Sequence, residues 1–352
     1  RAGMKNNSTS FIFEIAKSEI GYTKQQPSEF AAVIVAAAVK EGYEGPVFVQ
    51  GDHFQLKASN YFEDGEKEVN VVKELISKAI AAGFYNIDID SSTLVLLDKP
   101  DLDTQQKHNY EQAAALTQYI RDLEPKGVTI SVGGEIGEVG KQNSTVEELK
   151  AYMDGYKKIL PGGMKGISKI SVQTGTSHGG VPLADGTIAE VALDFDTLTD
   201  IGATSRSDYG ISGAVQHGAS TLPDEAFDRF SKCNTSEIHL ATGFQNMIYD
   251  MIPADLKDKV YGWIKTECAG EKNEKDTEDQ FIYKTRKKGF GAYKKDFWDL
   301  PAESRAKIGK TLEDKFDFLF KQLNAVNTKD AVAKHVKLVH VKPDVSKEIA
   351  AA

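Results

Sequence analysis

The sequence predicts an α/β fold, a (β/α)8 TIM barrel followed by a C-terminal helical extension. Two observations predict it. Short β-rich runs alternate with amphipathic helical patterns up to about residue 245, and the sequence from 246 onward is helical and charged. Steady alternation of strand and helix is typical of a parallel sheet with crossover helices. Because such barrels take about 250 residues, we predict a barrel domain at 1–245 and a mainly helical extension at 246–352.

Seven short β-rich runs are predicted strands. They lie at 10–17, 47–53, 86–91, 127–136, 166–175, 210–217 and 235–242. Helical periodicity predicts helices between them at 28–41, 66–82, 105–123, 145–159 and 222–232. A barrel needs an eighth strand, so either a first βα unit lies upstream of Arg1 or one strand is too weakly patterned to identify. In the extension, 312–323 is helical, and the Lys-rich run 283–295 is a solvated face or a contact with substrate or another subunit.

Composition excludes several classes of protein. The apolar fraction is 40%, and no apolar run approaches the roughly 20 residues that cross a membrane, so we expect a soluble protein with no membrane partner. The net charge of −9 argues against a nucleic-acid partner, since such proteins present a basic face. Two cysteines, Cys233 and Cys268, form no disulfide framework, and no leader-like segment opens the chain, which favours the cytoplasm.

Three of the seven histidines stand at the ends of predicted strands. His53 ends VFVQGDH, His178 follows ISVQTGTS, and His217 ends GISGAVQH. The C-terminal strand ends of a barrel meet at one mouth, where catalytic groups lie. One such histidine is usually an ordinary polar residue, but three at the same end favour a shared ion. Three imidazoles with an open fourth position are typical of catalytic zinc, so we predict a site for Zn²⁺ or another divalent cation.

Other residues at these strand ends extend the predicted site. Glu135 ends GVTISVGGE and is placed to complete the ligand set or to exchange with it. Gly179 follows His178, and Gly218 follows His217. These glycines lack the side chains that would keep backbone amides away from an anionic or hydroxylated substrate, although glycine is also an ordinary turn residue.

Five motifs together resemble a known family. They are GDH at 51–53, IDIDSS at 87–92, GGEIGEVG at 133–140, GTSHGG at 175–180 and QHGAS at 216–220. In order and spacing they are similar to the class II, metal-dependent fructose-bisphosphate and tagatose-bisphosphate aldolases over roughly 10–245. In that alignment 10–17 resembles the family's second strand, which would put the first βα unit before Arg1.

The resemblance implies roles for individual residues. The three strand-end histidines correspond to the metal ligands, with Glu135 a further ligand in some members. Asp52 corresponds to the catalytic acid that exchanges a proton with the oxygen of the aldehyde-side carbon; its alternative role is to support the ligands by hydrogen bonding. Asp90 and Ser92 correspond to the polar wall behind the ion.

The resemblance also implies the chemistry. It predicts a zinc-dependent lyase that cleaves and forms the C3–C4 bond of a ketose or ketose phosphate through a metal-stabilised enediolate, without a Schiff-base lysine. Asp52 would take the C4 hydroxyl proton during cleavage. Family members are usually homodimers or larger, and the same is expected here.

Three departures from the family pattern concern proton transfer and phosphate binding. Where the family has an acidic pair this chain has 141–143 (KQN), so Glu138 is the candidate substitute. The phosphate loop His-Gly-Gly-Ser-Gly reads HGAST at 217–221, which keeps Ser220 but predicts weaker phosphate binding. In the last strand the family's Asn-x-Asp-Thr-Asp is replaced by 239–243 (HLATG), where Thr242 is retained and His239 is a substrate contact or an inert residue.

Other functions remain open at this point. The same metal-held carbonyl suits an epimerase of a ketose or keto-uronate, which would conserve carbon number. A metal-dependent isomerase is less consistent with the sequence, because such enzymes surround the ion mainly with carboxylates. A non-catalytic sugar-binding relative fits the lost acidic pair, but retention of the predicted metal ligands and of Asp52 argues against it.

Overall fold

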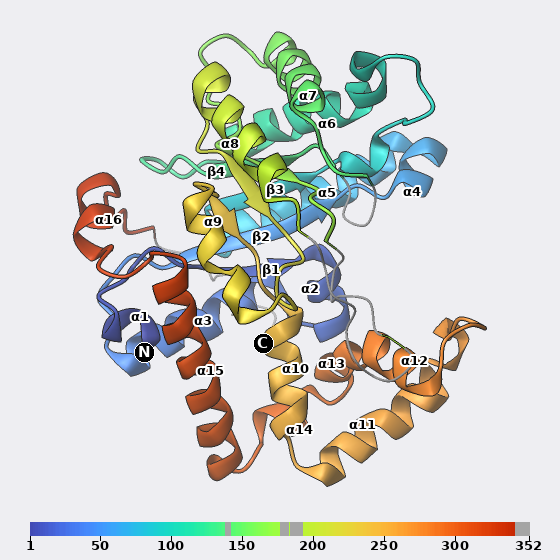
Figure 1. Cartoon of the computed structure of the whole chain (residues 1–352), viewed down its shortest axis with the longest axis vertical. Helices are drawn as coiled ribbons and strands as arrows, with labels where there is room; N and C mark the ends of the chain where they lie inside the picture. The colour runs from blue at the N-terminus through green and yellow to red at the C-terminus, as the bar shows by residue number, and fades with distance from the viewer. Residues whose placement is uncertain (138–141, 177–182, 184–192, 342–352) are drawn as a thin grey trace, which may run out of the picture.

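Seven parallel strands form one sheet in the computed structural model, which describes residues 1–137, 142–176, 183 and 193–341. The strands are β1 (Ile12–Ala16), β2 (Phe48–Gln55), β3 (Asn86–Asp90), β4 (Ser131–Glu135), β5 (Lys169–Val172), β6 (Ala214–Gln216) and β7 (Glu237–Ile238). Each strand pairs only with its sequence neighbours. The alternation of the sequence therefore correctly predicted a parallel α/β sheet (Figure 1).

The sheet is curled so that its two edges approach each other. Glu14 on β1 lies 3.0 Å from the ring of His239, which directly follows β7. Among the described residues β1 and β7 share no ladder, and the sheet has seven strands. The strand ends are register-matched: Ala16 pairs with Asp52, and Glu135 pairs with Ser171. Their C-terminal ends thus open on one side.

Helices connect the strands. They are α2 (Lys17–Thr23), α3 (Pro27–Glu41), α4 (Ala58–Glu63), α5 (Gly65–Ala81), α6 (Leu102–Asp122), α7 (Val146–Ile159), α8 (Phe195–Tyr209) and α9 (Asp228–Lys232), with short turns η1 (Ser92–Leu94) and η2 (Asp224–Ala226), and α1 (Ala2–Lys5) precedes the sheet. Side chains of Asp64, Asp101, Thr145 and Asp194 accept backbone N–H bonds at the starts of α5, α6, α7 and α8. These caps satisfy donors that a helix start leaves unpaired.

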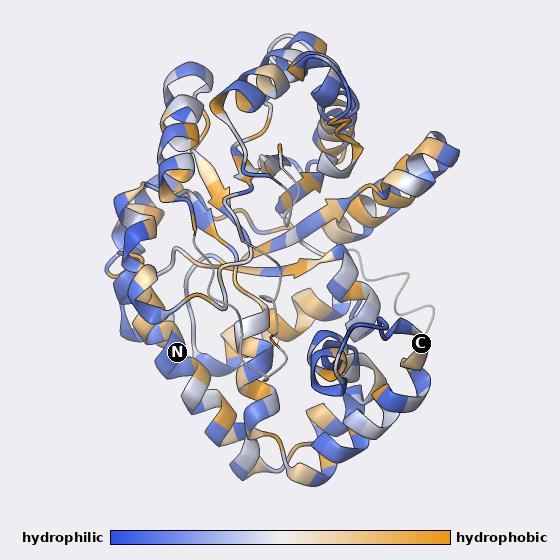
Figure 2. Cartoon of the chain, turned by 45° about the vertical axis from the view of Figure 1, so that its right-hand side comes forward, coloured by the Kyte–Doolittle hydropathy of each residue, from blue (hydrophilic) through white to orange (hydrophobic). Residues whose placement is uncertain are grey.

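The main hydrophobic core lies between the sheet and these helices. Val132 and Ile170 from the sheet and Val72, Leu116 and Leu149 from the helices are fully buried there. Most helices carry hydrophilic and hydrophobic residues side by side, as expected when one face packs on a core (Figure 2). The predicted helix at 222–232 was too long: η2 and the short α9 occupy it, and α8 was not predicted.

The described chain after β7 is helical. It forms α10 (Thr242–Met251), α11 (Ala254–Glu267), η3 (Ala269–Glu271), α12 (Glu278–Thr285), η4 (Arg286–Lys288), α13 (Gly289–Ala292), α14 (Lys294–Trp298), α15 (Ala302–Gln322) and α16 (Lys329–His335). Tyr249, Val260 and Ile264 centre a second hydrophobic core. Helix α15 returns along α10 and places Leu319 in the main core (Figure 1). No helix among the described residues is both long and apolar enough to cross a membrane.

Candidate metal centre

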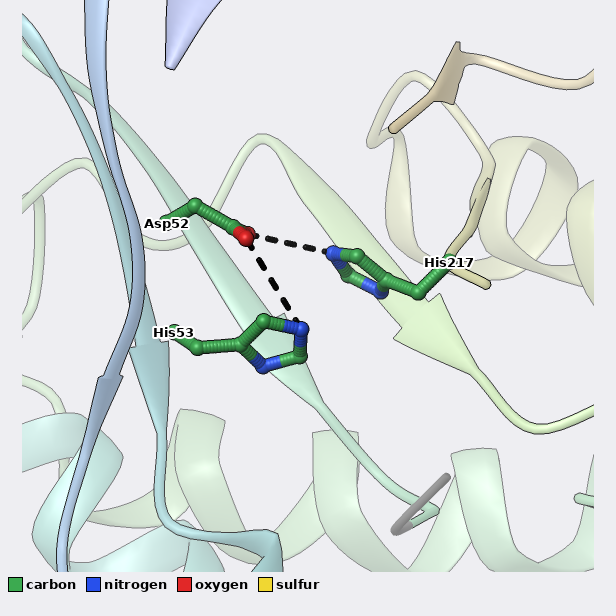
Figure 3. A group of neighbouring side chains, drawn as sticks. All are labelled: Asp52, His53 and His217. Atoms are coloured by element: carbon green, nitrogen blue, oxygen red, sulfur yellow. Dashed lines mark hydrogen bonds and ion pairs between the residues drawn. The ribbon is translucent and has the colours of Figure 1, made fainter. Parts of the chain in front are cut away.

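A bulge in β2 lets two adjacent residues, Asp52 and His53, point into the site. Its pairing with β3 shifts register between Gly51 and Phe54, and His53 has a left-handed φ of 41°. In a regular strand neighbouring side chains point to opposite faces, whereas a bulge redirects one of them. Asp52 and His53 therefore both reach toward His217 (Figure 3). A bulky residue at positive φ is uncommon, and such conformations concentrate at functional sites.

His217 follows β6 and completes a compact group. Its Nε2 is 3.2 Å from Asp52 Oδ1, and its ring centroid is 4.2 Å from that of His53. Candidate ligand atoms of Asp52, His53 and His217 all lie within 4.8 Å of one another. Asp52 and His217 are buried and His53 is nearly so. Residues far apart in sequence thus share one small volume.

Two further carboxylates face the other side of His53. Asp90 ends β3 and Glu135 ends β4; their oxygens lie 3.1 Å and 3.2 Å from His53 Nδ1. Ser92 donates its hydroxyl hydrogen to Asp90 Oδ1 at 2.7 Å, and Gln55 donates to Oδ2 at 2.6 Å. Asp90 is thereby fixed against the imidazole.

The pKa values reflect this crowding of opposite charges. Burial alone would raise the pKa of Asp52, but the charges of His53 and His217 and hydrogen bonds from His217 and His239 hold it well below its usual range. Burial alone would lower the pKa of His53, but the carboxylates of Asp52 and Glu135 raise it well above normal. Burial and the neighbouring cationic imidazoles lower the pKa of His217. Burial and the charge of Asp90 raise the pKa of Glu135 to about 8.

These residues fit a divalent cation. Imidazole nitrogens and carboxylate oxygens are the donors that zinc takes in catalytic sites. Three carboxylates, those of Asp52, Asp90 and Glu135, surround His53, so a buried positive charge is favoured at this position. A neutral His217 is a suitable ligand because metals bind deprotonated imidazole.

The structure describes some of the other predicted site residues but not all of them. His178, Gly179 and Glu138 lie outside the described residues. Gly218 follows His217 with φ of 68°, and Thr242 starts α10. An added Cβ on Gly243 would lie 2.5 Å from the Ser220 carbonyl oxygen, so the loop holding Ser220 packs on the start of α10.

His239 is buried among acids. Its Nδ1 is 3.0 Å from Glu14 Oε2 and 3.1 Å from Asp52 Oδ1, and its Nε2 is 3.0 Å from Glu237 Oε2. Burial alone would lower the pKa of His239, but Glu14 and the hydrogen bonds to Asp52, Glu14 and Glu237 raise it well above normal. The ring therefore donates from both nitrogens.

Sequence reasoning missed a polar layer inside the sheet. Its members, Glu14, Gln50, Asp88, Lys169 and Glu237, come from five different strands. One signal was present: Asp88 and Asp90 are two positions apart in NIDID, so a strand directs both to the same face. A charged residue inside an otherwise apolar strand thus marked the interior.

The chain is similar to known proteins in sequence family and in fold. The family model "Fructose-bisphosphate aldolase class-II" matches residues 2–319. No curated protein matches the sequence. A probable tagatose 6 phosphate kinase from Sinorhizobium meliloti 1021 shares the fold, with TM-score 0.59, 15% identity and coverage of 94% of this chain and 86% of that chain. Fructose-bisphosphate aldolase from Campylobacter jejuni aligns with TM-score 0.49, 16% identity and coverage of 93% and 86%.

Proposed function

We propose that this chain, which belongs to the class II fructose-bisphosphate aldolase family and is an aldolase-type carbon–carbon lyase, cleaves and forms a ketose or ketose phosphate with the help of zinc. The observation that carries the proposal is the buried group of Asp52, His53 and His217 at the open ends of β2 and β6. We assign His53, His178 and His217 as zinc ligands, with Glu135 as an additional one. The motifs at these positions resemble those of the family's ligands.

A zinc ion in this position would supply Lewis-acid polarisation of the substrate carbonyl and so stabilise the negative charge that develops as C3–C4 breaks. Around it, Asp90, held by Ser92, would fix the orientation of His53. Gly179, Gly218 and Ser220 would offer backbone and hydroxyl groups to a phosphate or sugar hydroxyl, and Thr242 at the start of α10 a further hydroxyl.

Asp52 is assigned the proton transfer at the C4 oxygen. Its Oδ1 accepts hydrogen bonds from His217 and His239, while its Oδ2 lies 3.9 Å from His53 Nε2, beyond hydrogen-bond distance. A carboxylate that is fixed in this way beside the proposed ligands is placed to exchange a proton with a substrate hydroxyl. Glu138 remains the candidate for the second proton transfer.

The assay that tests this function uses zinc-loaded protein and a chelated control. Fructose 1,6-bisphosphate, tagatose 1,6-bisphosphate, unphosphorylated ketoses and keto-uronates are supplied, and products are followed by mass and NMR. Chelator-sensitive release of three-carbon fragments is expected. A sugar of unchanged mass would instead indicate an epimerase and overturn the proposal.

We also propose that the sheet closes into an eight-stranded barrel, that the protein is a homo-oligomer and that it is cytoplasmic. The curl that brings Glu14 to His239 supports the closed barrel. The location is supported by free thiols at Cys233 and Cys268.

Helix α3 supports the homo-oligomer. Its outward positions Val33, Val35 and Val39 are 42%, 50% and 76% exposed, while Ile34 is buried on the sheet. A helix that is apolar on all sides is normally covered, and a two-fold contact would cover this one.

Charged residues on this face should separate the copies. We expect the double variant Val35→Glu, Val39→Glu to sediment as a monomer while the wild type sediments as a dimer, because burying two carboxylates opposes association. Leu97→Glu, at a residue 50% exposed on a different element, is the matched control. A monomeric wild type, or a double variant that still dimerises, would exclude α3 as the contact.

A further inference from the structure

A buried lysine lies inside the sheet, beneath the metal centre. Lys169 on β5 is 1% exposed, and its Nζ lies 3.1 Å from Asp88 Oδ1 and 2.6 Å from Gln50 Oε1. The amine also forms a short ion pair with Glu237 on β7. Barrel interiors are usually filled by branched apolar side chains, and a buried charge is costly unless well paired. A charge at this position therefore calls for an explanation.

The backbone leaves room for this ion pair. A Cβ added to Gly133 on β4 would lie 2.3 Å from Asp88 Oδ1 and 3.0 Å from Lys169 Cε. A real side chain does not tolerate the first contact. The Asp88–Lys169 pair thus occupies space that exists only because position 133 is glycine.

Lys169 is linked through Glu237 and His239 to Asp52, the proposed proton-transfer group. Glu237, held by Lys169, accepts from His239 Nε2 at 3.0 Å, and His239 Nδ1 lies 3.1 Å from Asp52 Oδ1. Both ring nitrogens are engaged, so the imidazole has one favourable orientation. The ring of His239 also meets that of His217 edge-on, with centroids 4.3 Å apart. An unbroken series of contacts runs from Lys169 to Asp52.

We propose that Lys169 is a positioning residue which, through Glu237 and His239, fixes the Asp52 carboxylate in the orientation needed for proton transfer. This inference rests on the proposed function, since it assigns Asp52 its role there. Loss of Lys169 would remove the ammonium group that lies between Glu237 and Asp88, and Glu237 would no longer be held in place as the acceptor of His239.

The surroundings of Lys169 argue against the other role of a lysine in a barrel, that of a Schiff-base nucleophile. A nucleophilic amine must be neutral and must reach the substrate carbonyl. Burial alone would lower the pKa of Lys169, but the charges of Asp88 and Glu237 outweigh burial and raise the pKa above its ordinary value. The amine is committed to three acceptors beneath the site.

The kinetic test compares Lys169→Met, Glu237→Gln and the double variant in the zinc-loaded enzyme. Each single change is expected to lower kcat by on the order of 10- to 100-fold with KM within about threefold, because orientation of a reacting group acts in the transition state. The double variant should lose no more than the single ones, since both residues act along one path. Metal content should stay at the wild-type value.

Lys78→Met is the matched control, because Lys78 forms an ion pair with Glu74 on the exposed side of α5, away from the sheet interior. It should keep wild-type kcat. Unchanged kcat in Lys169→Met, a loss confined to KM, or multiplying losses in the double variant would overturn the proposal. If Lys169→Met does not fold, the kcat of the isosteric variant Glu237→Gln tests the proposal in its place.

A second measurement needs no turnover. Side-chain ¹⁵N NMR of histidine-labelled protein follows the two ring nitrogens of His239, which contact Asp52 and Glu237. Both resonances should move in Glu237→Gln and Lys169→Met but not in Lys78→Met. If the wild type converts no sugar, the proposed function fails. These spectra alone then test whether Lys169 and Glu237 fix the position of His239. Unmoved resonances, or a borohydride-reduced ketose adduct on Lys169, would overturn the inference.

Discussion

His217→Ala is expected to empty the metal centre and to abolish turnover. His217 supplies one of the two described imidazoles in the group and is 2% exposed, and burial and the neighbouring imidazoles lower its pKa, which favours the neutral form that binds a metal. Its loss removes one of the proposed ligands. Metal content after dialysis, measured by mass spectrometry, and the aldol cleavage assay check this expectation.

His108→Ala is the control for that experiment. His108 lies on α6 against the rings of Tyr61 and Phe62, away from the site, and its loss removes an imidazole without touching the candidate ligands. It should retain metal and activity. A metal-free His217→Ala protein with substantial activity would contradict the metal-dependent mechanism, and one with full metal content would remove His217 from the ligand set.

Asp52→Ala is expected to keep the fold and the metal but to lower the rate by a factor on the order of 10² to 10⁴, the usual effect of removing a positioned acid or base. The reason is geometric: His217 and His239 hold the Asp52 carboxylate through Oδ1, in the group where we propose that the substrate binds. Initial rates and metal content, measured on the same preparation, separate this effect from loss of the ion.

Asp98→Ala provides the comparison, because the Asp98 side chain is 73% exposed and pairs only with the adjacent Lys99. Its rate should equal that of the wild type. Normal activity of Asp52→Ala would remove Asp52 from the proton-transfer step. Loss of metal together with activity would instead assign Asp52 to holding the ligands.

The strands could be predicted because each is a short β-rich run between helical patterns. Asp52, His53 and His217 could be placed together because parallel strand ends converge. The sequence did not predict α8, whose buried positions include Gly202 and Ser205, residues of low helix propensity. Every strand except β2 was predicted too long, since hydrogen-bonded pairing ends before the β-rich pattern does.

The interior charges were less accessible from sequence. Lys169 and Glu237 are separated by 68 positions and lie on β5 and β7, with β6 between them, so the order of strands in the sheet brings them together. Periodicity assigns a residue to a face of its strand, but it does not show which residue of another strand it will meet. The role of Gly133 is likewise invisible in sequence, because it depends on the side chains of Asp88 and Lys169.

The bulge in β2 sets a condition for anyone who transplants this centre into another scaffold. Copying Asp52, His53 and His217 onto two regular strands would turn one of the adjacent pair outward, because His53 reaches the interior with a left-handed φ of 41° at the bulge. A designer must reproduce the extra residue and the backbone around it before choosing any side chain. The transferable unit is therefore a segment of main chain, and a copy made by side-chain substitution alone would lack one of the proposed ligands.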